Sequence, residues 1–170
     1  MTLRALAILA ASVAITLLVL VRSPGVSEVR FPMPASKVYV QECGSCHTAY
    51  APGLLPARAW RKMMSELADH FGEDASLADP HYFAILKELE TLAADGSHAD
   101  MRMRRIQAAI PAGESPQRIS QTRYFKALHD EVPVKIWRRK GVGAAANCLA
   151  CHIRANEGRY SESEVRVPEK

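Results

Sequence analysis

The chain has 170 residues, a length that allows one domain or two small lobes. Only four phenylalanines and two tryptophans serve as large core residues, so a bulky buried group would add stability that the side chains do not supply. The formal net charge is +4, and the basic clusters at 102–105 and 135–140 belong to no nucleic-acid-binding motif. The sequence therefore does not support a nucleic-acid partner.

An uncharged apolar run lies at the N-terminus, between Arg4 and Arg22. It is at the short limit for a membrane span and slightly long for the apolar part of a signal peptide, and no Ala-x-Ala cleavage site follows it. A buried core helix is the alternative, but it would need a larger protein around it. We therefore expect residues 1–27 to be a signal peptide or an uncleaved membrane anchor. The rest of the chain is then exported, because the positive end of such a segment is retained.

The remainder has helical periodicity, with no alternating strand pattern longer than a few residues. The predicted helices span residues 36–46, 55–72, 79–96, 99–109 and 120–133. Ser36 and Asp79 are expected as N-caps, and Gly72 as the end of the second helix. The apolar stripes of the second and third helices are Trp60, Met63, Met64, Leu67 and Phe71, and Phe83, Leu86 and Leu89. The linker-like stretch at 111–117 divides the chain into predicted lobes at 28–110 and 111–170.

Two stretches have the same pattern, QECGSCHTAY at 41–50 and NCLACHIRAN at 147–156. Each is a Cys-x-x-Cys pair followed at once by histidine, and together they use all four cysteines. Two thiols at this spacing match the two vinyl groups of a porphyrin, and the next imidazole is delivered below the iron. The sequence therefore predicts two covalently attached haems c. The first is attached by Cys43, Cys46 and His47, and the second by Cys148, Cys151 and His152.

Two other chemistries use closely spaced cysteines. Disulfide exchange would need a thioredoxin-like strand and helix pattern around the pair, which is absent. A structural zinc site usually separates its two pairs by a dozen to about twenty residues, far fewer than here. Neither chemistry explains a histidine directly after both pairs. Attachment of haem c takes place outside the cytoplasm, so the N-terminal segment and the motifs support each other.

Each iron has one more axial position, and histidine there lowers the reduction potential relative to methionine. His70 and His129 follow apolar residues at helical spacing, so they are the preferred ligands. His81 and His98 lie in polar surroundings and are expected to be exposed. Pairing by proximity in sequence puts His70 with the first haem and His129 with the second, although a crossed pairing stays open.

Methionine is the rival ligand at the first haem. Met63 or Met64 would reach it, but both also fit a core stripe. The part of the chain after the linker contains no methionine, which favours histidine more strongly at the second haem.

The residues of several sequence segments, and the order of these segments, resemble the bacterial dihaem cytochrome c family, DHC. These segments lie at 43–77, 123–133, 141–152 and 157–168. The resemblance implies bis-histidine haems, with His47 and His152 as proximal ligands and His70 and His129 as distal ones. It also implies a periplasmic electron carrier whose partner is a membrane b-type cytochrome or a small monohaem cytochrome.

We therefore expect a mainly α protein in which small cytochrome c-like lobes pack around two haems, with an apolar helix at the N-terminus. The expected function is single-electron transfer between a membrane-bound donor and a redox partner, without enzymatic activity. The protein is expected in the periplasm, either soluble or anchored to the cytoplasmic membrane. The alternatives are a dihaem peroxidase or reductase, or a haem-based sensor, each of which needs one open iron.

Overall fold

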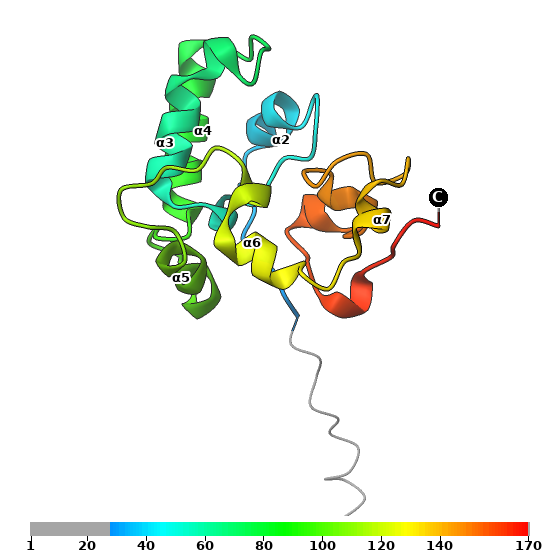
Figure 1. Ribbon diagram of the computed structural model, residues 1–170. Coiled ribbons are helices and arrows are strands. Elements are labelled where there is room, and N and C mark those ends of the chain that lie inside the picture. The colour runs from blue at the N-terminus through cyan, green and yellow to red at the C-terminus, as the bar shows by residue number, and fades with distance from the viewer. Residues whose placement is uncertain (1–27, 170) are drawn as a thin grey trace, which may run out of the picture.

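The computed structural model describes residues 28–169, which form helices and turns (Figure 1). Within this range the only β-type pairings are isolated bridges, so the predicted mainly α class is confirmed. The expected apolar helix in residues 1–27 lies outside the described residues. Among the helices of residues 28–169, none has the length and apolarity needed to cross a bilayer.

The α-helices are α2 (Lys37–Cys43), α3 (Ala57–Ser65), α4 (Asp79–Leu92), α5 (Met101–Ala108), α6 (Arg123–Leu128) and α7 (Val134–Trp137). Short 3-10 turns connect them: η1 (Pro52–Leu54), η2 (Leu67–Asp69), η3 (Ile119–Gln121), η4 (Cys148–Ala150), η5 (Ala155–Glu157) and η6 (Glu162–Glu164). The short α7 was not predicted; it begins directly after Pro133, where the sequence predicts only the end of a helix.

The helix caps follow the sequence in part. Ser36 caps α2, and its hydroxyl accepts a hydrogen bond from the backbone N–H of Val38 at 3.1 Å, as predicted. The predicted cap at Asp79 is wrong, because the N-cap of α4 is Ala78 and its side chain makes no capping bond. Asp79 and Pro80 are instead the first two helical residues. There the missing N–H of proline costs no bond and the carboxylate meets the positive end of the helix dipole.

The predicted helix 55–72 is too long, because α3 ends at Ser65. In a continued helix the carbonyl of Leu67 would accept from the N–H of Phe71. Instead it accepts from Ala75 N at 2.8 Å, and the N–H of Phe71 donates to Asp69. The chain therefore turns back on itself after η2, which takes His70 off the helix.

The main core lies in the N-terminal half, where α3 packs along α4 (Figure 1). Trp60 is buried there, and its indole N–H donates to the carbonyl of Pro52 at 2.8 Å. Two residues of the predicted stripes are wrong: Phe71 is 49% exposed and Phe83 is 64% exposed. Ile85 and Leu89, four positions apart on α4, form the buried face instead of Phe83.

The C-terminal half lies on the other side of the molecule from α3 and α4 in Figure 1. Its large apolar side chains contribute little to the main core, in which the fully buried residues run from Phe31 to Ile110. Residues 28–31 pair with this half, since Phe31 N donates to Gly158 and Tyr160 N donates to Val29, each at 2.8 Å. The division into lobes at residue 110 stays a prediction.

Candidate functional site

The first cysteine motif begins at the end of α2. Cys43 is the last helical residue, and Cys46 and His47 follow in the turn after it. The ring centres of His47 and His70 are 6.1 Å apart, with an interplanar angle of 31°. The Nδ1 atom of His47 lies 2.8 Å from the carbonyl oxygen of Thr48. Because a carbonyl only accepts, this bond requires the Nδ1–H tautomer and leaves Nε2 free to bind a metal.

The second motif lies on η4 and the turn after it. The ring centres of His129 and His152 are also 6.1 Å apart, with an interplanar angle of 79°. The Nδ1 atom of His129 lies 2.8 Å from the carbonyl oxygen of Phe125, which again leaves Nε2 free. The His129 ring stacks on Phe125 at 4.0 Å and lies 5.9 Å from Trp137, so its orientation is fixed by neighbours from its own segment.

The spacing of the two histidine pairs fits two rings on opposite sides of one iron. A bond of about 2 Å from imidazole nitrogen to a transition metal, plus about 1 Å from nitrogen to ring centre, separates two opposed rings by about 6 Å. Both pairs match this distance. The structure thus brings His47 to His70 and His129 to His152, the pairing expected from proximity in sequence.

The other candidate ligands lie elsewhere. His81 is exposed and its Nδ1 atom is 2.8 Å from a carboxylate oxygen of Glu42. His98 is also exposed and interacts with the adjacent Ser97. Met64 is buried in the main core at 4% exposure, where its packing accounts for it.

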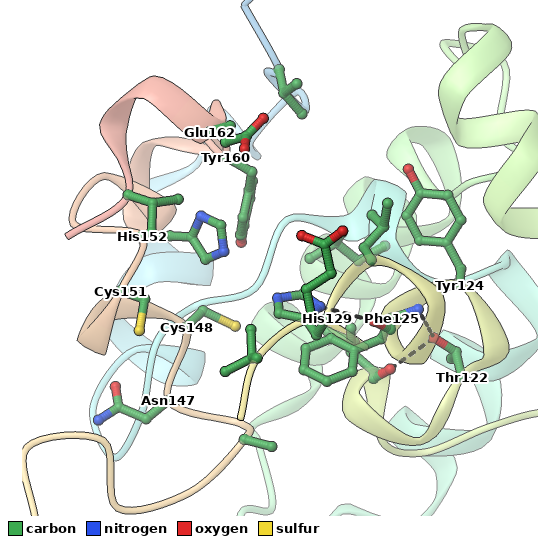
Figure 2. A pocket seen from close by; sticks show the side chains of 18 of the residues that line it. Thr122, Tyr124, Phe125, His129, Asn147, Cys148, Cys151, His152, Tyr160 and Glu162 are labelled. Atoms are coloured by element: carbon green, nitrogen blue, oxygen red, sulfur yellow. Dashed lines mark hydrogen bonds between the residues drawn. The ribbon is translucent and has the colours of Figure 1, made fainter. Parts of the chain in front are cut away.

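A cavity of about 480 Å³ lies between His129 and His152, a size typical of cofactor and ligand sites. Figure 2 shows His152 and Tyr160 on one side of it and His129 with Phe125 on the other, with the thiols of Cys148 and Cys151 nearby. Most of its other lining residues are apolar: Val29, Phe31, Leu54, Ile119, Leu128, Val132, Ile136, Trp137, Val142, Val165 and Val167. The C-terminal half is thus built around an apolar space where a core would otherwise be.

Two buried polar atoms at this cavity have no hydrogen-bond partner within residues 28–169, Nδ1 of His152 and the hydroxyl of Tyr160. Buried polar groups are normally paired, so such orphans indicate a site completed by something other than the chain. The apolar lining, the thiols and the facing imidazoles all fit a haem.

The protonation states of the site favour neutral groups. Burial raises the pKa of the Cys43 and Cys148 thiols to about 11, and all four thiols are free. Reactive thiols have a lowered pKa, so Cys43 and Cys148 are not activated for disulfide exchange. Burial also lowers the pKa of His70 and His152, and their neighbours His47, Arg118 and His129 add to the shift. The neutral imidazole is the form that binds a metal.

The sequence did not reveal Tyr50 as part of the site. Its ring stacks on His47 at 5.0 Å and 25°, and its hydroxyl donates to the carbonyl of Ala146 at 2.8 Å. Tyr50 therefore connects the first motif to the residues just before Cys148. The only sign of this role in the sequence was that Tyr50 lies three residues after His47, because its hydrogen-bond partner, Ala146, is far away in the sequence.

Comparison with known proteins gives one consistent group. The family model "Dihaem cytochrome c" (DHC) matches residues 39–160. Diheme cytochrome c from Rhodobacter sphaeroides is 37% identical, with a TM-score of 0.66 over 74% of this chain and 97% of its own. A second structure, of DHC purified from Rhodobacter sphaeroides, is 35% identical, with a TM-score of 0.61 over 76% of this chain and 100% of its own.

The X-ray structure of a diheme cytochrome type c from Shewanella baltica OS155 is also similar. It is 33% identical, with a TM-score of 0.65 over 81% of this chain and 96% of its own. No curated protein matches the sequence. The matched range, residues 39–160, includes both cysteine motifs and the positions of His70 and His129.

Proposed function

Since this chain belongs to the dihaem cytochrome c family, we propose that it carries single electrons between a membrane-bound donor and a redox partner. It is a c-type cytochrome with two covalently attached haems. In our proposal Cys43 and Cys46 form the thioether bonds at the first haem, and Cys148 and Cys151 those at the second. When bound, each haem supplies an iron that accepts and releases one electron.

The two histidine pairs complete the proposal. His47 and His70 bind the first iron, and His152 and His129 bind the second. The single observation that carries this assignment is the 6.1 Å spacing in both pairs. The hydrogen bonds from Nδ1 of His47 and His129 to backbone carbonyls support it, because they direct Nε2 at the metal and raise the basicity of the ligand. Two imidazole ligands give a reduction potential below that of a histidine–methionine cytochrome.

The proposed ligation of each iron by two histidines favours an electron carrier over an enzyme. When protein side chains fill both axial positions of each iron, none is left for a substrate such as hydrogen peroxide. A reductive titration of the holoprotein should take up two electrons per chain, and a soluble one-electron acceptor should reoxidise it. Steady turnover of hydrogen peroxide by the purified protein would instead identify a peroxidase.

We further propose that the protein works in the periplasm, delivered there by residues 1–27. Its partners would be a membrane b-type cytochrome or a small monohaem cytochrome. The support for an acidic docking partner lies in residues 123–140, which surround His129 and carry six basic residues against two acidic ones. This surplus of four equals the net charge of the entire sequence, so the remaining residues are balanced.

The exposed basic residues of this segment are Arg123, Lys126, Lys135, Arg138 and Lys140. Opposite charges on two proteins accelerate association at low ionic strength, and salt screens the effect. The rate of electron transfer to an acidic cytochrome should therefore fall steeply between low and physiological salt. A rate that does not depend on ionic strength would remove the basic segment from the docking model.

A further inference from the structure

The distal side of the first haem site is a tight turn. His70 N donates to Glu73 O at 2.7 Å, and Glu73 N donates back to His70 O at 3.3 Å. The two residues between them have positive φ angles, 59° at Phe71 and 97° at Gly72. Glycine adopts this left-handed conformation freely, whereas a bulky side chain rarely does. The turn that presents His70 therefore contains a strained residue directly beside the proposed ligand.

The ring of Phe71 is contacted by Arg118, a residue that lies far from it in the sequence. The Phe71 ring lies 4.8 Å from the His70 ring, and the guanidinium carbon of Arg118 lies 4.0 Å from its centroid. A cation over an aromatic face at this distance is an attractive contact. Phe71 is 49% exposed, so burial in the core does not explain its position. Arg118 precedes η3 in an extended conformation and reaches the turn from a distant part of the sequence.

The second haem site has no such dependence on a remote residue. His129 hydrogen-bonds to the carbonyl of Phe125 and lies between Phe125 and Trp137, all within α6, α7 and the turn between them. The ring contacts of His70 are with His47 across the site and with Phe71 beside it. The two proposed distal ligands are thus held in different ways.

We propose that Arg118 is a positioning residue for the first haem, holding His70 on its iron by fixing Phe71 in the turn. The inference rests on the bis-histidine ligation proposed above. Loss of the Arg118 contact lets the turn relax and His70 leave the iron, which opens the first haem to a small neutral ligand such as carbon monoxide. The second haem keeps its ligand, because the contacts that hold His129, with Phe125 and Trp137, do not involve Arg118.

The test compares the full-length holoprotein with the variants Arg118→Gln and Arg118→Lys, using carbon monoxide as the probe of the reduced protein. Arg118→Gln should bind one carbon monoxide per chain about two- to fivefold faster than the unaltered protein, because both partners of the lost contact are exposed. Arg118→Lys keeps the charge but loses the planar guanidinium, so an intermediate rate is expected. The matched control is Arg104→Gln, which removes an exposed positive charge from α5 and should change nothing.

A second variant and a second readout guard against a folding defect. Phe71→Gly removes the ring that Arg118 contacts and gives the backbone beside His70 more freedom, so the turn is no longer fixed and carbon monoxide binding should also accelerate. Electron paramagnetic resonance of the oxidised variants should still show two low-spin haems, because an effect of this size leaves His70 bound most of the time, whereas a folding defect would disturb both signals.

The outcomes separate the two proposals. If Arg118→Gln and Phe71→Gly bind carbon monoxide no faster than the unaltered protein, or if both haems open together, Arg118 has no positioning role. If the unaltered protein already has a high-spin first haem, the bis-histidine proposal itself is wrong.

Discussion

Tyr50 offers a sensitive test of how the two haem sites are joined. Its hydroxyl donates to the carbonyl of Ala146, and its ring stacks on His47. Burial raises the pKa of Tyr50 to about 12, with a further contribution from Cys148, so the hydroxyl remains a donor at neutral pH. Tyr50→Phe removes this hydrogen bond and keeps the stacked ring, whereas Tyr50→Leu removes both.

The expected cost follows from the surroundings of the bond. A hydrogen bond between neutral groups contributes about 0.5–1.5 kcal/mol, and loss of a buried partner costs more. Ala146 is exposed, so water can replace the hydroxyl and the lower end applies. Tyr50→Phe should therefore lower the free energy of unfolding by about 0.5–1 kcal/mol, which is a fall of about 1–4 °C in Tm for a chain of this size. Tyr50→Leu also loses the aromatic pair, a further loss of about 0.5–1.5 kcal/mol.

The assay is urea unfolding of the holoprotein, followed by far-UV circular dichroism and by haem absorbance. The reasoning requires a graded series in which phenylalanine costs less than leucine and both haem spectra stay low-spin before unfolding. Equal costs for the two variants would show that the stacked ring contributes nothing. A phenylalanine variant as stable as the unaltered protein would refute the hydrogen bond between the two sites.

Three further predictions follow from the site. Replacing Cys148 and Cys151 with serine should reduce the covalent haem content from two to one per chain by intact-protein mass; an unchanged mass increment would contradict the assigned attachment. His129→Gly should make the second haem high-spin, and added imidazole should restore the low-spin spectrum, whereas His98→Gly should have no effect on either haem. The apoprotein should lose part of its helical circular dichroism at 222 nm, because the C-terminal half, which contains α6 and α7, buries few large apolar side chains of its own; a spectrum like that of the holoprotein would show that this half folds without haem.

Local signals in the sequence predicted much of the helical structure. Ser36 acts over one turn of chain, so the start of α2 follows from neighbouring residues. The helix predicted to run to Pro133 ends earlier, at Leu128, and Pro133 instead precedes α7. The end of α3 does not follow from neighbouring residues, because it depends on the bond from Ala75 to Leu67, which forms only when the chain folds back. His70 was expected on an apolar helix face and instead projects from a turn, although it still meets His47.

The long-range contacts that position residues of the two sites could not be predicted from the sequence. Arg118 over Phe71 and Tyr50 on Ala146 each join residues far apart in the chain, and neither carries a local pattern. Phe83 shows the same limit, since helical spacing identifies an apolar stripe but not which side of α4 meets α3. The cysteine motifs were predictable because the chemistry itself fixes their spacing.

The most direct test of the central claim is an optical spectrum of the exported protein, oxidised and dithionite-reduced, with and without carbon monoxide. Two bis-histidine haems predict sharp low-spin bands, no far-red band from a methionine–iron bond, and no immediate spectral shift on addition of carbon monoxide. A high-spin component in the resting protein that binds carbon monoxide at once would mean that one iron is open, and would contradict the assignment as an electron carrier.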